Sequence, residues 1–222
     1  MSTTDEPTFF NPHQRATVEA AMARIIPTDE HAGAREAGTI DFLERYLSGI
    51  GYVYALPDGS GFEELHGRQA QAWQQRIDLA REKYVHGVTE LDRLAQQRHG
   101  SPFVDLAEDQ QDAVLRSIED PSAETGAGAS RGAHAIAYGG PVEPALQQTN
   151  TESELEFFPL LVAHTRQGFL ADPVYGGNRD RLGWRAIGFP GPSSLAQVHT
   201  GQYNTLDYFA ENRVHRGQEE TS

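Results

Sequence analysis

The segment from Tyr175 to Gly191 constrains the fold of this chain more than any other stretch. It holds five glycines and one proline in seventeen residues, so it cannot form the interior of a helix or a central strand. It also holds large apolar side chains, which do not suit a solvated linker, among them Tyr175, Trp184, Ile187 and Phe189. The combination predicts an ordered loop, with glycines that permit unusual backbone angles and aromatic side chains that pin the loop to a surface.

Apolar side chains recur at helical spacing over most of the remaining chain. The pattern predicts helices at about 12–26, 34–48, 62–99, 107–118 and 152–170. Gly38 indicates either close helix packing or a later helix start capped by Thr39, and His86-Gly87 indicates a break or kink in the long helix. No alternating strand pattern stands out. We therefore expect a mostly α fold, an irregular bundle of five or six helices with long ordered loops and little or no sheet.

The length of 222 residues suffices to bury one sizeable core. We expect a single helical domain over residues 1–222. Residues 122–133 consist almost wholly of small and polar types, so an irregular loop is predicted at about 120–151, either solvated or wrapped around a partner. A second irregular region, rich in glycine, proline and aromatic residues, is predicted at about 172–222.

Composition excludes several classes of function. The net charge of −14 argues against nucleic acid and anionic membranes as partners. The absence of cysteine excludes disulfides, iron–sulfur clusters and thiolate metal sites. No apolar run approaches the length of a membrane span, so membrane insertion is not expected. The first nine residues show no basic region, twin arginine or apolar stretch, which predicts a cytoplasmic location without a signal peptide.

The sequence shows no motif typical of a catalytic, cofactor-binding or metal-binding site. Neither glycine pair, Gly139-Gly140 or Gly176-Gly177, has the spacing of a dinucleotide-binding turn. No two histidines lie four residues apart, and no His-Glu-x-x-His motif occurs. The nine histidines are His13, His31, His66, His86, His99, His134, His164, His199 and His215.

Two further sets of polar residues have structural explanations. His164 lies on a helix of aromatic character, and a hydrogen-bonded structural histidine is favoured over a ligand there. Glu152, Glu154 and Glu156 fall in the first turns of a predicted helix, where carboxylates favour the helix dipole. Trp73 and Tyr84 are predicted to lie in the core.

Two blocks of motifs nevertheless support a resemblance. The C-terminal block reads His164-Thr165, Gly168-Phe169, Asp172-Pro173 and then the 175–191 segment; the N-terminal block reads Arg24–Asp29, Gly33-Ala34, Glu36–Gly38 and Asp41–Leu43. Over residues 10–191 the chain resembles the gluconate 2-dehydrogenase subunit 3 family. Many members carry an export signal, and this chain departs from them in that respect.

The resemblance implies a non-catalytic small subunit that accompanies a flavoprotein of the glucose–methanol–choline type. The large subunit would carry FAD and act on sugars, glycosides or polyols, while the small subunit would bind no cofactor, stabilise its partner and shape the entrance to the active site. Two alternatives stay open: a stand-alone metal-dependent enzyme that uses the scattered histidines and glutamates, or a transient folding or maturation factor.

The loop residues are the candidates for the partner interface. They are Tyr175, Gly177, Asn178, Arg181, Trp184, Phe189 and Pro190. The competing interpretation is a clasp in which the same residues cover the core of their own chain.

Overall fold

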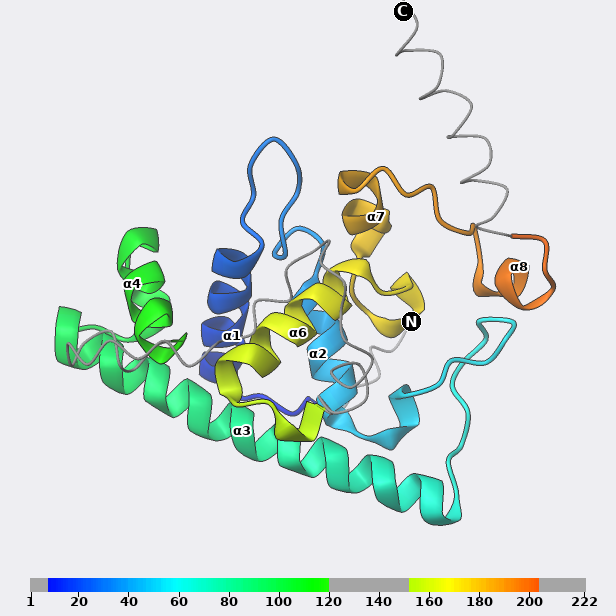
Figure 1. Ribbon diagram of the computed structural model, residues 1–222, viewed down its shortest axis with the longest axis horizontal. Coiled ribbons are helices and arrows are strands. Elements are labelled where there is room, and N and C mark those ends of the chain that lie inside the picture. The colour runs from blue at the N-terminus through cyan, green and yellow to red at the C-terminus, as the bar shows by residue number, and fades with distance from the viewer. Residues whose placement is uncertain (1–7, 120–151, 204–222) are drawn as a thin grey trace, which may run out of the picture.

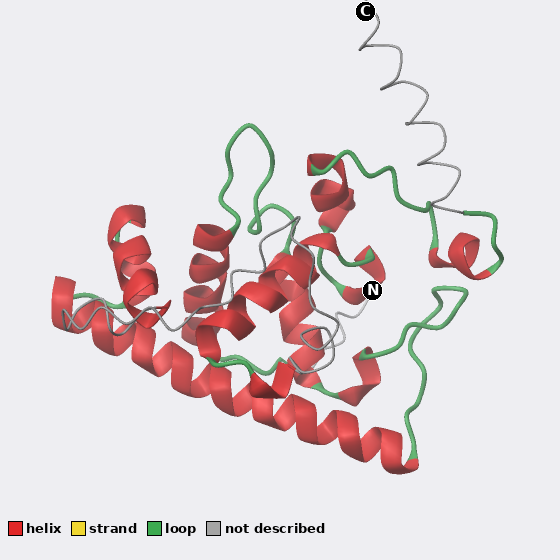
Figure 2. Ribbon diagram, in the orientation of Figure 1, coloured by secondary structure: helices red, strands yellow, loops and turns green. Residues whose placement is uncertain are grey.

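The computed structural model describes residues 8–119 and 152–203. These two ranges contain seven α-helices: α1 Pro12–Ile25, α2 Thr39–Ser48, α3 Gly67–His99, α4 Glu108–Glu119, α6 Phe157–Leu170, α7 Leu182–Ala186 and α8 Leu195–His199. In these two ranges the only strand-like pairing is an isolated antiparallel bridge between Ala55 and Phe62, and Figure 2 shows helices joined by loops. The predicted mostly α fold is confirmed.

The long helix α3 forms one side of the molecule, and α1, α2 and α6 pack against it and against one another (Figure 1). The α4 helix packs on the C-terminal half of α3, whereas α7 follows α6 at the other end of the bundle. The core lies between these elements. Its largest fully buried side chains include Met22, Leu43, Leu47, Tyr84, Leu91, Phe103, Leu160 and Leu161.

The start of α1 agrees with the sequence pattern, and the start of α2 is later than its periodicity alone suggests. Asn11 and Gln14 form a capping box at α1. Gly38 occupies the cap position of α2 with a φ of 63°, a left-handed angle that ends the preceding turn. The helix therefore begins at Thr39, but Thr39 does not cap it, since its buried hydroxyl has no hydrogen-bond partner.

The predicted break in the long helix is wrong. α3 runs unbroken past Gly87, which is buried. A Cβ at this position would collide with the ring of Phe157, so the glycine allows α6 to approach α3 closely. The helix begins at residue 67 rather than 62, because the chain around Phe62 pairs with Ala55.

The remaining predictions of element boundaries concern the chain from residue 120 onward. The predicted 152–170 helix is two elements, a short 3-10 turn Glu152–Glu154 and then α6. The predicted 120–151 loop lies outside the described residues. The region predicted as irregular from residue 172 contains, as far as it is described, the short helices α7 and α8 between loops.

Candidate functional site

Residues 172–191, here called the clasp, lie backbone to backbone against the end of α6. A Cβ at Gly177 would collide with the carbonyl oxygen of Gly168, and a Cβ at Gly183 would collide with that of Phe169. Only glycine permits this approach. Two of the glycines that marked the segment in the sequence are therefore required by contacts with the preceding helix.

Asn178 joins the two ends of this contact. Its side chain is fully buried, and its backbone has a φ of 50°, a left-handed angle that asparagine tolerates better than most residues. Its Nδ2 donates to the carbonyl oxygen of Ala171 at 2.9 Å, and the backbone N–H of Gly183 donates to its Oδ1 at 2.8 Å. The side chain thus ties the end of α6 to the start of α7.

Trp184 packs on its own chain. Its side chain is 6% exposed, and its Nε1 donates to the carbonyl oxygen of Leu170 at 2.8 Å. Phe189 contacts the indole edge to face at 5.4 Å. Gly191, with a φ of 62°, passes so close that a Cβ there would collide with the indole ring. The tryptophan is the centre of the clasp.

The clasp also contacts the other sequence block of the resemblance. The backbone N–H of Arg179 donates to the carbonyl oxygen of Ala37 at 2.8 Å, and its Nη2 pairs with Asp41 at 2.8 Å. Arg45 of α2 donates to the carbonyl oxygen of Val174 at 3.1 Å. The two motif blocks, distant in sequence, therefore form one contact region in space.

The seven candidate interface residues all lie in the clasp, but they differ in accessibility. Gly177, Asn178 and Trp184 are buried, and their contacts are within the chain. The others keep exposed surface and are Tyr175, Arg181, Phe189 and Pro190. These four residues are the candidates that remain available for a surface contact at this end of the molecule.

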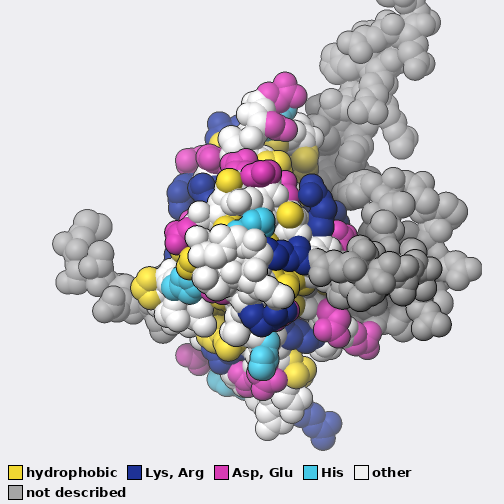
Figure 3. Space-filling view, turned by 90° about the vertical axis from the view of Figure 1, so that its left-hand side faces the viewer, with side chains coloured by type: hydrophobic (Ala, Val, Ile, Leu, Met, Phe, Trp, Pro, Cys, Tyr) yellow, Lys and Arg dark blue, Asp and Glu magenta, His cyan; other side chains and the backbone are white. Residues whose placement is uncertain are grey.

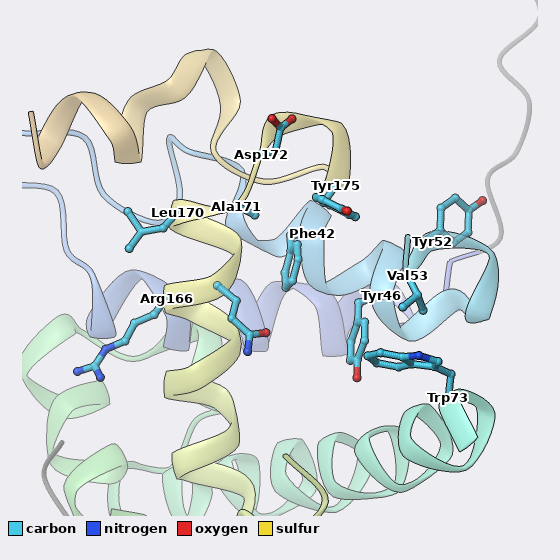
Figure 4. A pocket seen from close by; sticks show the side chains of 11 residues that line it. Phe42, Tyr46, Tyr52, Val53, Trp73, Arg166, Leu170, Ala171, Asp172 and Tyr175 are labelled. Atoms are coloured by element: carbon cyan, nitrogen blue, oxygen red, sulfur yellow. The ribbon is translucent and has the colours of Figure 1, made fainter. Parts of the chain in front are cut away.

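An open groove of about 550 Å³ lies beside the clasp and is here called the aromatic groove. Figure 4 shows its walls, with Phe42 and Tyr46 from α2, Trp73 from α3 and Tyr175 from the clasp. Its lining is predominantly apolar. The remaining lining residues are Tyr52, Val53, Arg166, Gln167, Leu170, Ala171 and Asp172. Trp73, predicted to be a core residue, is partly exposed there.

A buried polar network lies behind the groove and is centred on Glu152. The hydroxyl of Tyr46 donates to its Oε1 at 2.6 Å, and Nε of Arg76 donates to its Oε2 at 2.7 Å. The Nε2 of His164 lies 2.9 Å from Oε1, and the Nδ1 of the same ring lies 2.9 Å from the hydroxyl of Tyr84. All these partners belong to the chain, so the network joins α2, α3 and α6.

The network shifts the pKa values of Glu152 and Tyr46 in opposite directions. Burial alone would raise the pKa of Glu152, but hydrogen bonds from His164 and Tyr46 and the charge of Arg76 lower that pKa to about 2. Burial and the neighbouring Glu152 charge raise the pKa of Tyr46. The carboxylate is ionised at neutral pH, and its partners hold it inside the fold.

Sequence reasoning explained His164 and missed Glu152. His164 is a structural, hydrogen-bonded histidine, as expected. Its side chain is fully buried between Tyr84 and Glu152. The assignment of Glu152 to a helix dipole is wrong, since this residue lies in the 3-10 turn before α6 and is 8% exposed. No local pattern marks it, because Tyr46 and Arg76 come from distant helices.

Within residues 8–119 and 152–203, no group of three or more His, Cys, Asp or Glu side chains could hold a metal ion. None of the helices described is both long enough and apolar enough to cross a bilayer.

Comparison with protein families finds a match over most of the chain. The family model for gluconate 2-dehydrogenase subunit 3 matches residues 12–191. The match begins at the first residue of α1 and ends at the last residue of the clasp. Comparison with curated proteins and with solved structures finds no match.

Proposed function

Since the chain belongs to the gluconate 2-dehydrogenase subunit 3 family, we propose that it is the non-catalytic small subunit of an FAD-dependent oxidoreductase complex. In this proposal the large subunit is a flavoprotein of the glucose–methanol–choline type, which carries the FAD and oxidises a sugar, a glycoside or a polyol. The present chain binds no cofactor of its own. It stabilises the large subunit and shapes the entrance to its active site.

The observation that carries this proposal is the family match across residues 12–191. The geometry supports it in two ways. The carboxylate of Glu152 is 8% exposed, and its hydrogen bonds go to partners within the chain. The aromatic groove, in contrast, is open and apolar, as expected of a surface that contacts another protein.

Co-expression of the full chain with its flavoprotein tests the proposal. We expect a tagged chain to retain the flavoprotein in constant stoichiometry, and the complex to show flavin absorbance and sugar-dependent reduction of a dye. The isolated chain should show neither. Stoichiometric flavin in the isolated chain, or reduction of the dye by the isolated chain, would contradict the proposal. A flavoprotein that keeps its activity and stability after the small chain has dissociated from it would favour a maturation factor.

A further inference from the structure

The aromatic groove has exposed apolar side chains along its borders. Leu170, at the end of α6, lines the groove and is 37% exposed. Trp73 belongs both to the groove and to a shallow hollow on α3 that contains Leu79, which is 43% exposed. Tyr54 packs edge to face on Trp73 at 5.7 Å and is itself exposed. The apolar surface therefore extends from the end of α6 to the outer side of α3.

The opposite walls of the groove are held in place by one buried carboxylate. The guanidinium of Arg76 lies 4.8 Å from the centre of the Trp73 ring and also binds Glu152. Tyr46, from the α2 wall, binds the same carboxylate. A groove with fixed walls loses little side-chain freedom when it is filled, which lowers the cost of binding. This indicates a preformed binding surface rather than a gap between helices.

Three arginine side chains lie at the α6 and clasp end of this surface, beside Asp172 and Asp180. Arg166 lines the groove and is exposed, and its side chain makes no hydrogen bond or ion pair with the described part of the chain. Arg181 and Arg185 line an adjoining hollow together with Pro173 and Asp180, and the hydrogen bonds of both arginines go to backbone carbonyl oxygens, that of Arg185 to Asp180 itself. On a chain with a net charge of −14, three arginines without a described carboxylate partner favour an acidic surface opposite them.

The side of the molecule that carries α4 differs in character. Figure 3 shows acidic, basic and histidine side chains intermixed there, with apolar side chains in small separate areas. An ordinary solvated surface has this composition. The aromatic groove is thus distinguished from this side by the continuity of its apolar surface.

We propose that the aromatic groove is the docking site for the flavoprotein large subunit, and that it receives a ridge of aromatic or aliphatic side chains flanked by carboxylates that face Arg166, Arg181 and Arg185. This inference rests on the proposed function and adds the surface and the chemistry of the partner. The clasp residues then act mainly by fixing one wall of the groove, while the groove side chains make the contact.

The test compares two exposed apolar residues of similar accessibility. Leu170→Asp places a charge in the groove, and Val85→Asp makes the same change on α3 at a residue that is 42% exposed and lines none of the three hollows described. Binding is measured by titration against the FAD-loaded flavoprotein, with thermal melting to confirm folding. We expect Leu170→Asp to weaken binding at least about tenfold, and Val85→Asp to change it by less than about twofold.

A second pair tests the charge component. Arg166→Glu reverses a charge at the groove, and Arg116→Glu does so on the exposed surface of α4. Arg166→Glu should weaken binding about three- to tenfold at low salt and less at high salt, because exposed charges are screened. Arg116→Glu should leave the affinity almost unchanged.

The outcomes separate this inference from the proposed function. A wild-type chain that binds no flavoprotein overturns both. Wild-type binding that Leu170→Asp leaves intact overturns the docking site alone, and the proposed function stands. The wild-type chain could also associate with itself, and Leu170→Asp could abolish this self-association while the affinity for the flavoprotein stays unchanged. That result would assign the groove to a second copy of the chain and would also overturn the inference.

Discussion

The clasp and the Glu152 network hold the same two helices, α2 and α6, by opposite means. The clasp relies on missing side chains, because Gly177 and Gly183 let the backbone pass against the end of α6. The network relies on a buried charge that Tyr46, Arg76 and His164 surround. The comparison indicates that the first region should respond to changes of shape and the second to changes of charge and pH.

The largest effect is expected from Trp184→Ala. This change removes the buried centre of the clasp and should cost roughly 3–5 kcal/mol of folding free energy. In a protein of this size the melting temperature of the isolated chain should fall by about 10 °C. Trp73→Ala is the matched control, since Trp73 is partly exposed in the groove, and it should cost only about 1 kcal/mol. Equal melting of the two variants would show that the clasp does not stabilise the free chain.

Glu152→Gln should have the next largest effect. The substitution keeps the shape but removes the charge that Arg76 and Tyr46 bind, and loss of one member of a buried pair costs about 3 kcal/mol. Chemical denaturation of the isolated chain measures the change. A control at an exposed glutamate of the same turn, Glu154→Gln, should alter stability by less than about 0.5 kcal/mol. A Glu152→Gln variant as stable as the wild type would show that the charge of Glu152 does not stabilise the fold.

The pH dependence of unfolding separates the two regions further. The pKa of Glu152 is about 2 in the fold against 4.5 ordinarily, so its contribution is present above about pH 4.5 and is lost as the pH falls toward 2. The contribution lost should be on the order of 3 kcal/mol. The Trp184→Ala variant should retain this pH dependence, whereas Glu152→Gln should lose most of it. If Trp184→Ala lost the pH dependence and Glu152→Gln kept it, the pH response would not come from the buried carboxylate.

The smallest expected effect comes from two glycines of the clasp. Gly188 and Gly191 both have left-handed angles, but only Gly191 would place a Cβ against Trp184. Gly188→Ala should cost about 1 kcal/mol for its backbone angle alone, and Gly191→Ala about 1–2 kcal/mol more because of the overlap. Melting of the two variants measures the difference. Equal costs would indicate that the contact between Gly191 and the indole is not tight.

The sequence by itself determined the elements that depend on near neighbours along the chain. The capping box of Asn11 and Gln14 fixes the start of α1, and helical periodicity predicts the mostly α fold. The glycines and aromatic residues of 175–191 predict an ordered loop. Each of these features is local, because helix caps and turns depend on residues within about one turn.

Only the tertiary structure decided what the less patterned residues do. Gly87 would break a helix by local preference, yet it continues α3 because Phe157 packs against it. The local sequence predicts that Glu152 is a carboxylate at the start of a helix. In the fold it binds Arg76 and Tyr46, which are 76 and 106 residues away in sequence. The aromatic groove likewise combines side chains from α2, α3, α6 and the clasp. Burial and charge pairing act through space, so these roles arise only when the helices are brought together.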